Sequence, residues 1–482
     1  MTGNKHLTRR EYLQKTAVLA LGTGVSGCDM SSPKTTPANG RRQASSESSA
    51  YDNGSVPISQ SGWATPPNEF ADYPMLEGDI DADIAIVGAG LAGASLALHL
   101  TEAGVKVAVL EAHQPGWGAS GRNAGHVLPT LKDINLINGF ADGGRRFLEA
   151  FREHHTIPFD LSEKYGISCD SAQLGYLNMC SGVDSYEEQK KAAAFWKEQQ
   201  GQQIAFLDTA DMQRFTGSSY YPYGVLYESG GRINPYQFTN GMIAAAVDQG
   251  ALVFGNSEAL SINKNNKRWQ VSSENGSVTA AQVVFCTNAY PGSIAPSLGN
   301  NFYPLTAYAL STQPLSKEAL EVINPGRATL SQAPVSLNPF IIDEHNRIIM
   351  SSIPRASSPE DSERHFQDNL AWIHRTWPES KALNIKLEHY WTGRVALRDR
   401  EFPGVFELDK GVYGLMHFNA WGNVMAPLMG KLLAQGLQAD RMDQLPFPLE
   451  KPTPVAMPAK QDILIRKLLI PAARIGQKFN IL

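Results

Sequence analysis

The feature of the sequence that most constrains its fold is the run DIAIVGAGLAGASLALHLTEAGVKVAVLEA at residues 83–112. A β-branched strand leads into Gly88, Gly90 and Gly93 in the pattern G-x-G-x-x-G, and an Ala- and Leu-rich helix and a second strand follow, ending at Glu111. The glycines permit close approach of the backbone to a pyrophosphate, the helix N-terminus offers it amides, and Glu111 is the expected acceptor for ribose hydroxyls. The run predicts a dinucleotide-binding unit; a structural glycine turn and a surface position for Glu111 are the alternatives.

The next segment, WGASGRNAGHV at residues 117–127, distinguishes between dinucleotides. It resembles the segment by which the D-amino acid oxidase family runs along FAD from the pyrophosphate to the isoalloxazine ring. The matching positions, and therefore the implied cofactor-binding residues, are Ser120, Gly121, Arg122, Asn123 and Gly125. The resemblance implies FAD, held noncovalently, and not NAD.

Further blocks of the same family pattern extend the resemblance over residues 81–438, nearly the whole body of the chain. In that family the last helix points its N-terminus at a carbonyl of the flavin pyrimidine. Gly422, Asn423 and Val424 hold that place here. A helix dipole stabilises the negative charge that grows on a flavin as it is reduced.

The resemblance implies an α/β fold in which a FAD-binding Rossmann domain, of the glutathione-reductase-like type, is interleaved with an antiparallel-sheet substrate domain. We expect the body to span residues 61–458. Its FAD-binding parts are predicted at about 81–170, 225–300 and 385–440, and its substrate domain at about 171–224 and 301–384. Apolar alternation predicts strands at 173–179, 303–315, 340–343, 346–352 and 384–395, and helices are indicated at 184–199 and 360–376.

The resemblance also implies the chemistry: a hydride leaves the carbon beside an uncharged amine for flavin N5, and water hydrolyses the imine. Amino acid oxidases of the family hold the substrate carboxylate with an arginine after W-x-G, and Arg394 stands there; an ion pair with Asp399 is the alternative. His126 and His417 follow blocks that face the flavin and are candidates for contact with the ring or for tuning substrate protonation. A structural role is the alternative for each histidine.

The N-terminal stretch TRREYLQKTAVLALGTGVSGC, residues 8–28, resembles a twin-arginine export signal, although a general secretory signal stays open. Its end resembles a lipobox, in which Cys28 is acylated; an ordinary cysteine is the alternative. We therefore expect a signal peptide at residues 1–28. Residues 29–60, rich in Ser, Thr, Pro, Asn and Gly, are predicted to be a disordered tether.

The C-terminal residues 459–482 alternate apolar clusters with Lys and Arg. We expect either an interfacial helix, broken by Pro471, on an anionic membrane, or a basic helix docked on the body. Together with a lipid at Cys28, an interfacial helix would anchor the protein to a membrane. We expect it on the exported, periplasmic or cell-envelope face. Oxygen or membrane quinone is then the electron acceptor.

Net charge and cysteine spacing argue against a nucleic-acid-binding protein and against a metal site. The net charge of −5, with no basic stripe before the C-terminus, argues against a nucleic-acid partner. The cysteines other than Cys28 have neither C-x-x-C nor His-rich spacing, so no metal site is predicted; a Cys169–Cys180 disulfide is allowed but not demanded. The first functional hypothesis is an amino acid or amine oxidoreductase. The alternatives are a flavoprotein maturation factor acting on a partner protein, and a binding protein that has lost FAD.

Overall fold

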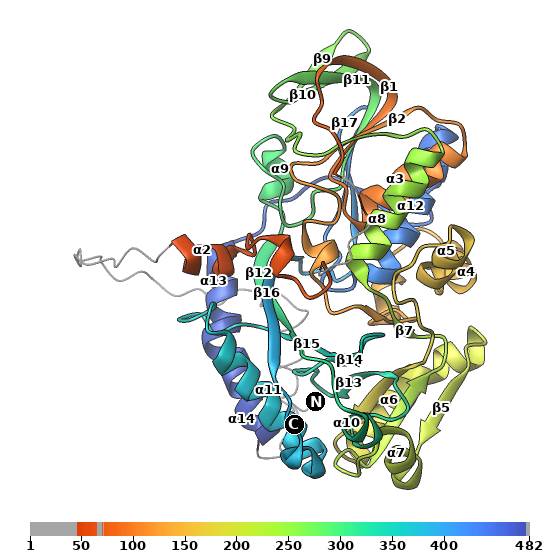
Figure 1. The fold of residues 1–482 in the computed structure, drawn as a ribbon. Coiled ribbons are helices and arrows are strands. Elements are labelled where there is room, and N and C mark those ends of the chain that lie inside the picture. The colour runs from red at the N-terminus through yellow and green to blue at the C-terminus, as the bar shows by residue number, and fades with distance from the viewer. Residues whose placement is uncertain (1–45, 65–69, 71, 479–482) are drawn as a thin grey trace, which may run out of the picture.

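The computed structural model describes residues 46–64, 70 and 72–478. They form two large sheets, drawn one above the other in Figure 1, and the chain passes between them several times. This confirms the predicted α/β class with two interleaved sheets. The predicted helices and strands are also confirmed. Residues 184–199 and 360–376 are mainly helical, and the five predicted strands overlap observed ones.

The nine-stranded sheet contains the predicted nucleotide-binding unit. Its main path runs β19-β17-β18-β11-β1-β2-β8, and β1 pairs in parallel with β11 and β2. The inner parallel strands are continuous apolar runs because helices or strands cover both of their faces. The strands are β1 (Gly78–Val87), β2 (Val107–Leu110), β8 (Leu252–Phe254), β9 (Ser261–Asn265), β10 (Arg268–Ser272), β11 (Gly276–Phe285), β17 (Gly404–Asp409), β18 (Val412–Met416) and β19 (Leu449–Glu450).

The eight-stranded sheet has the order β16-β12-β15-β14-β13-β4-β6-β5 and is antiparallel except for the β4–β13 pair. One boundary prediction was wrong: β16 was expected in the FAD-binding part, but it pairs with β12 from Tyr303↔Leu397 to Thr312↔Leu387. The strands are β4 (Tyr176–Cys180), β5 (Ile204–Leu207), β6 (Tyr223–Tyr227), β12 (Tyr303–Thr312), β13 (Thr329–Ala333), β14 (Phe340–Ile342), β15 (Ile348–Ser352) and β16 (Leu387–Leu397).

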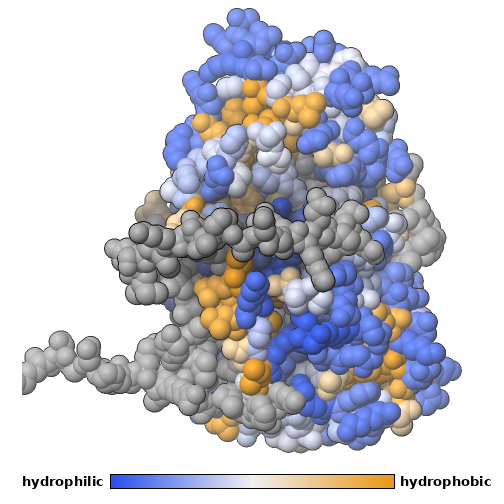
Figure 2. Space-filling view, turned by 90° about the vertical axis from the view of Figure 1, so that its left-hand side faces the viewer, coloured by the Kyte–Doolittle hydropathy of each residue, from blue (hydrophilic) through white to orange (hydrophobic). Residues whose placement is uncertain are grey.

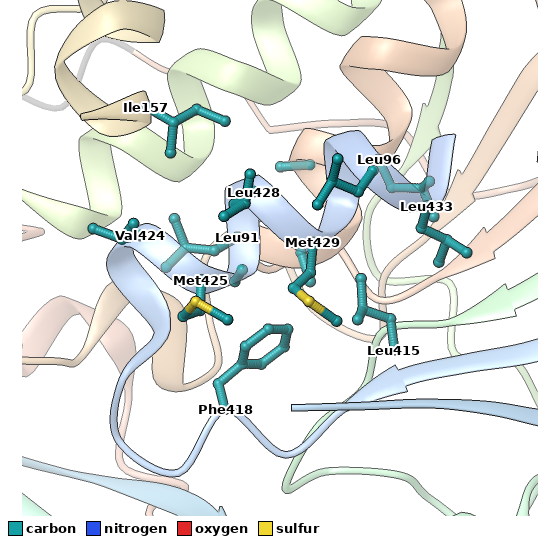
Figure 3. Packing of buried hydrophobic residues seen from close by; sticks show 14 of the residues in the cluster. Leu91, Leu96, Ile157, Leu415, Phe418, Val424, Met425, Leu428, Met429 and Leu433 are labelled. Atoms are coloured by element: carbon teal, nitrogen blue, oxygen red, sulfur yellow. The ribbon is translucent and has the colours of Figure 1, made fainter. Parts of the chain in front are cut away.

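Three helices pack together beside the nine-stranded sheet: α3, α8 and α12 (Figure 1). Figure 3 shows how side chains of α12 meet Leu91 of α3 and Phe418 in one apolar cluster. This cluster fixes the position of both helix N-termini. The helices are α2 (Ser46–Asn53), α3 (Leu91–Glu102), α4 (Arg145–His154), α5 (Ile157–Lys164), α6 (Val183–Ala194), α7 (Thr209–Thr216), α8 (Pro235–Asp248), α9 (Pro296–Gly299), α10 (Lys317–Val322), α11 (Ser362–Thr376), α12 (Gly422–Gln438), α13 (Pro458–Leu464) and α14 (Ile470–Lys478).

The end of the predicted tether belongs to the folded body, which corrects the sequence-based boundary at residue 60. Residues 46–60 contain α2 and a short 3-10 turn, and Val56 is fully buried. The ring of Tyr51 stacks on Tyr390 of β16 at 5.8 Å, so even a polar segment is ordered where its few aromatic and apolar groups find partners. Residues 1–45, including Cys28, lie outside the described residues.

The C-terminal tail is a helix that docks one face on the body, as the second of the two expected arrangements requires, and contact of its exposed residues with a membrane stays a prediction. A π-helical turn, η7 (Ile465–Leu469), joins α13 to α14, and Pro471 lies in the first turn of α14 without ending the helix. Ile465, Ile470 and Ala473 are buried against the body. Among the described residues, no helix has the length and apolar character needed to cross a membrane.

Cys169, Cys180 and Cys286 are buried free thiols, so the allowed Cys169–Cys180 disulfide is not formed. Burial raises the pKa of the Cys169 thiol to about 12, which keeps it protonated and unreactive at neutral pH. Within the described part of the chain, no group of His, Cys, Asp and Glu side chains has the arrangement of a metal site.

Candidate active site

The glycine turn between β1 and α3 is tight enough to exclude side chains. Gly88 has φ of +103°, and a Cβ there would lie 2.9 Å from the Cys286 carbonyl oxygen. A Cβ at Gly93 would lie 2.0 Å from the Gly88 oxygen, and one at Gly90 would lie 2.7 Å from Ser120 Oγ. The three predicted glycines therefore form an open backbone cradle at the N-terminus of α3.

Polar groups surround this cradle. Gly90 is the N-cap residue and provides no side chain to the first turn, while Ser120 Oγ accepts a hydrogen bond from the Leu91 amide at 2.9 Å. Glu111 accepts from the Ala89 amide at 2.8 Å and from the His113 amide at 3.1 Å. Burial raises the pKa of Glu111, although these amides oppose the shift. The carboxylate lies beside the glycine cradle, which fits the predicted contact with a ribose.

The loop after Ser120 is folded by its own side chains. Asn123 donates from Nδ2 to the Ser120 carbonyl at 2.9 Å and accepts from the Gly125 amide at 2.9 Å. Gly125 has φ of +79°, and a Cβ there would lie 2.6 Å from the Ile233 oxygen; one at Gly121 would lie 2.2 Å from the Gly116 oxygen. We call residues 120–126 the flavin loop, because the family resemblance predicts that they run along the flavin.

The N-terminus of α12 meets the flavin loop. Asn423 donates from Nδ2 to Asn123 Oδ1 at 3.0 Å and to the His126 carbonyl at 2.8 Å. The first turn, which contains Gly422, Asn423 and Val424, has no side-chain cap. The buried atoms Trp421 Nε1 and Asn423 Oδ1 have no hydrogen-bond partner in the described structure, so polar groups remain available for a ligand beside the loop.

His126 lies where the flavin loop reaches the eight-stranded sheet. Its Nδ1 is 3.2 Å from the Ala124 oxygen, its Nε2 is 3.3 Å from the Leu330 oxygen of β13, and its ring meets Tyr176 of β4 edge to face. Burial lowers the pKa of His126 to about 4, against the effect of these carbonyls. The imidazole is therefore neutral at pH 7, in a largely uncharged wall between the two sheets.

The arrangement fits FAD on two observations. The backbone cradle has no room for side chains, as a pyrophosphate site requires, and the uncapped α12 turn with its unpaired Trp421 donor lies at the far end of the loop. The family model described as FAD dependent oxidoreductase (DAO) matches residues 83–436. The chain belongs to this family. FAD is accordingly its cofactor.

The similarity to known proteins of this family and fold covers most of the chain. The gamma-glutamylputrescine oxidoreductase of Escherichia coli (strain K12) is 29% identical over 386 residues, which cover 78% of this chain and 88% of that protein. The structure of L-proline dehydrogenase from P. horikoshii superposes with a TM-score of 0.63 at 19% identity, covering 77% of this chain and 96% of that one. Glycine oxidase from Bacillus cereus ATCC 14579 gives a TM-score of 0.61 at 19% identity, with coverages of 76% and 97%.

Arg122, expected to bind the cofactor, has a positioning role in the structure. Its Nε donates to the Trp117 carbonyl at 2.7 Å, and its two terminal nitrogens donate to Thr392 of β16 at 3.2 Å and to Val56 at 2.8 Å. The guanidinium also lies over the Trp117 ring. It ties the flavin loop to the other sheet and to the N-terminal segment; direct binding of FAD by Arg122 stays a prediction.

Arg394, expected to bind a substrate carboxylate, lies on the face of β16 opposite to the flavin loop. On the face toward the flavin loop, Trp391 Nε1 donates to the Arg122 carbonyl at 2.9 Å, and Gly393 lies against the Arg122 side chain. Arg394 alternates to the other face, in register with Thr306, whose hydroxyl donates to the Asp52 carbonyl of α2. The alternative pair with Asp399 is not formed either.

His417, the third predicted catalytic residue, does not face α12. Its ring packs between Phe302 at 5.5 Å and Phe406 at 5.3 Å, and Phe406 belongs to the core on the other side of the nine-stranded sheet from Phe418. Both ring nitrogens are buried without partners, and burial lowers the pKa of His417 well below its usual value. These contacts give no support to the expectation that His417 contacts the flavin, which stays a prediction.

Sequence reasoning missed Trp63, which supports the flavin loop from outside. Its ring is buried against Gly125, and its Nε1 donates to the Asn123 carbonyl at 2.7 Å. Ser61 and Asn234 hold the same segment to the loop and to α8. The only signal in the sequence was a tryptophan in a polar stretch that was assigned to the start of the body.

Proposed function

We propose that this protein oxidises the C–N bond of an amine or amino acid. The observation that carries the proposal is the junction formed by Asn423, Asn123 and His126, where the uncapped helix N-terminus, the flavin loop and the eight-stranded sheet meet. The similar proteins named for gamma-glutamylputrescine, L-proline and glycine all act on compounds with a hydrogen-bearing carbon next to nitrogen.

FAD supplies the acceptor for the hydride that leaves this carbon, and water then converts the imine into a carbonyl compound and ammonia or an amine. The protein orients the substrate relative to the flavin and excludes water from the site. The amides of the first turn of α12 stabilise negative charge beside the loop. The neutral His126 and the buried Tyr176, which hydrogen-bonds with Ser331, favour the uncharged form of an amine because desolvation disfavours its ammonium.

We further propose that the amine, and not a carboxylate, is the main recognition element. The position of Arg394 on the α2 face gives no support to the expected carboxylate clamp. The described contacts of His126 and Tyr176 are to carbonyls, to Ser331 and to Tyr227, which are all uncharged. N-substituted amines in their uncharged form fit such a wall better than simple zwitterions.

Export and anchoring complete the proposal. The resemblance of residues 8–28 to a twin-arginine lipoprotein signal supports export of the folded flavoprotein and acylation of Cys28. A membrane position gives access to quinone as acceptor, with oxygen as the alternative. Mass spectrometry of the mature protein tests this step, because an N-terminal acylated Cys28 is expected and an intact leader contradicts it.

Anaerobic bleaching of the flavin in the purified full chain tests the activity. The panel is D-amino acids, L-amino acids, N-methyl amino acids and polyamines, and readmitted oxygen or added quinone identifies the acceptor. We expect amines to bleach the flavin and Arg394→Ala to change each rate less than twofold. Arg214→Ala, which removes an exposed arginine far from the flavin loop in sequence, is the control.

Each failure has a distinct meaning. A loss of more than tenfold in Arg394→Ala, confined to carboxylate substrates, would restore the carboxylate clamp. A yellow protein whose flavin no panel member bleaches would overturn the hypothesis that the substrate is a small amine or amino acid. It would favour a maturation factor that acts on a protein partner. A protein that binds no FAD would contradict the cofactor assignment itself.

A further inference from the structure

Exposed apolar side chains are concentrated in the C-terminal helix. Ten large hydrophobic side chains are exposed among the described residues, and four of them, Met457, Ile463, Leu468 and Ile475, lie within residues 457–475. Ile463, Leu468 and Ile475 are 51%, 59% and 60% exposed. Figure 2, which looks onto the side that carries α13 and α14 in Figure 1, shows hydrophobic surface on this face. Such clustering marks an interaction surface, because single exposed apolar residues are normally scattered.

The helix that carries this stripe is fixed in orientation. Its opposite face buries Ile465, Ile470 and Ala473 against Leu305, Val335 and Leu337 of the body. Arg466 is almost fully buried and donates to Asp52 at 2.6 Å and to Asp462 at 3.3 Å. The stripe of Ile463, Leu468 and Ile475, with the exposed Lys467 between them, therefore faces outward because the other face is docked.

The charge of the tail favours a lipid surface over a second copy of the chain. Residues 458–482 contain five basic residues and one acid, a formal charge of +4, whereas the whole chain carries −5. The single acid, Asp462, is already paired with Arg466. A symmetric dimer through this stripe would bring two such basic tails together, which is repulsive. An apolar stripe flanked by cations is the pattern of a helix that lies on an anionic membrane.

The chain enters the folded body beside the same helix. Asp52, the partner of Arg466, belongs to α2, the first helix of the described structure. Seventeen residues separate Cys28 from Ser46 at the start of α2, and they span at most about 60 Å when fully extended. A lipid at Cys28 and the stripe are thus attached to the body at one place.

We propose that the stripe of α13 and α14 docks on an anionic lipid surface, next to the point where the tethered N-terminus enters the body. The inference rests on the proposed membrane location and adds the orientation of the body on the membrane. The stripe would give the body a second contact with the lipid surface, beside the lipid at Cys28, and so hold the body in one orientation. The docked face of the helix also connects the membrane contact, through Arg466 and Asp52, to the segment that carries Trp63.

Vesicle binding of the full chain tests the proposal. Flotation and hydrogen exchange are measured with vesicles of phosphatidylglycerol and phosphatidylethanolamine and with neutral phosphatidylcholine vesicles. We expect anionic vesicles to slow exchange at least fivefold in peptides that cover residues 458–478. Leu468→Ser with Ile475→Ser should abolish that protection and weaken flotation at least tenfold, and Lys467→Glu should remove the preference for anionic lipid. Leu252→Ser with Leu260→Ser, at exposed apolar positions elsewhere, should change neither readout.

Other results would overturn the proposal. These are no protection of residues 458–478 by anionic vesicles, equal protection in the stripe variant, or a dimer in sedimentation velocity that the stripe variant converts to a monomer. Flavin absorbance and the unfolding temperature confirm that each variant is folded. None of these readouts uses turnover, so a failure here is distinguishable from a failure of the proposed amine oxidation.

Discussion

Asn423 and Asn123, three hundred positions apart, are joined by a hydrogen bond of 3.0 Å between Nδ2 and Oδ1. The same Asn423 nitrogen donates to the His126 carbonyl at 2.8 Å. Asn123 in turn closes its own loop by accepting from the Gly125 amide. One side chain thus sets the distance between the α12 N-terminus and the loop that follows the cofactor.

Asn423→Ala should weaken FAD binding by about tenfold to thirtyfold, because it removes two hydrogen bonds of about 1 kcal/mol each from the junction. The dissociation constant of FAD, measured by the recovery of flavin fluorescence, checks this. Asn263→Ala removes an exposed asparagine bond on β9 and serves as the control. An unchanged dissociation constant in Asn423→Ala would show that the junction does not position the cofactor.

Gly90→Ala should lower the affinity for FAD at least tenfold while leaving the fold intact. The added methyl would meet Ser120 Oγ at 2.7 Å and displace the hydroxyl that holds the Leu91 amide, in the cradle that receives the pyrophosphate. Gly139→Ala is the matched control, since a Cβ there meets nothing within 4 Å. Equal yellow colour and equal FAD affinity in both variants would contradict the placement of the cradle.

The cofactor-binding residues were predictable because they lie in short, continuous segments of the sequence. The glycines of the βαβ unit and the residues of the flavin loop each act through backbone geometry that only certain residues allow. Asn288 is an informative exception. It is not a glycine and yet has a left-handed φ of +45°, and its Oδ1 accepts from the His417 amide at 2.9 Å. Asparagine tolerates this conformation because its side chain hydrogen-bonds locally.

Side-chain direction and long-range packing were not predictable. Arg394 follows the expected W-x-G, but the register of β16 with β12 turns it to the face that carries α2. The polar sequence of residues 46–60 gave no sign that Tyr51 and Val56 would find partners on β16 and Arg122. Likewise, the apolar and basic pattern of the tail was compatible with membrane or body, and only the contacts of Ile465 and Ile470 establish docking.

His417→Phe should stabilise the protein by about 1 to 2 kcal/mol, because it removes two buried unpaired nitrogens from an aromatic environment. The pKa of His417 is lower in the folded than in the unfolded state. The wild type therefore loses stability as the pH falls below about 6.5, when the unfolded chain takes up the proton. Urea unfolding at pH 5 and pH 8 checks both effects, and the gain should be larger at pH 5. A destabilised variant, or one with an altered flavin spectrum, would instead show that His417 has a polar partner in the loaded protein.

Trp63→Phe should lower FAD affinity about fivefold, because it keeps a ring beside Gly125 but removes the Nε1 bond to the Asn123 carbonyl, worth about 1 kcal/mol. Trp269→Phe is a matched control. It removes a similar bond, from Nε1 to the Lys410 carbonyl, in a cluster that lacks the flavin loop. Both variants should lose a similar amount of stability in urea unfolding, and only Trp63→Phe should lose cofactor affinity. If the two variants bind FAD equally well, the segment that precedes the family region merely stabilises the fold; a selective loss makes it part of the cofactor site.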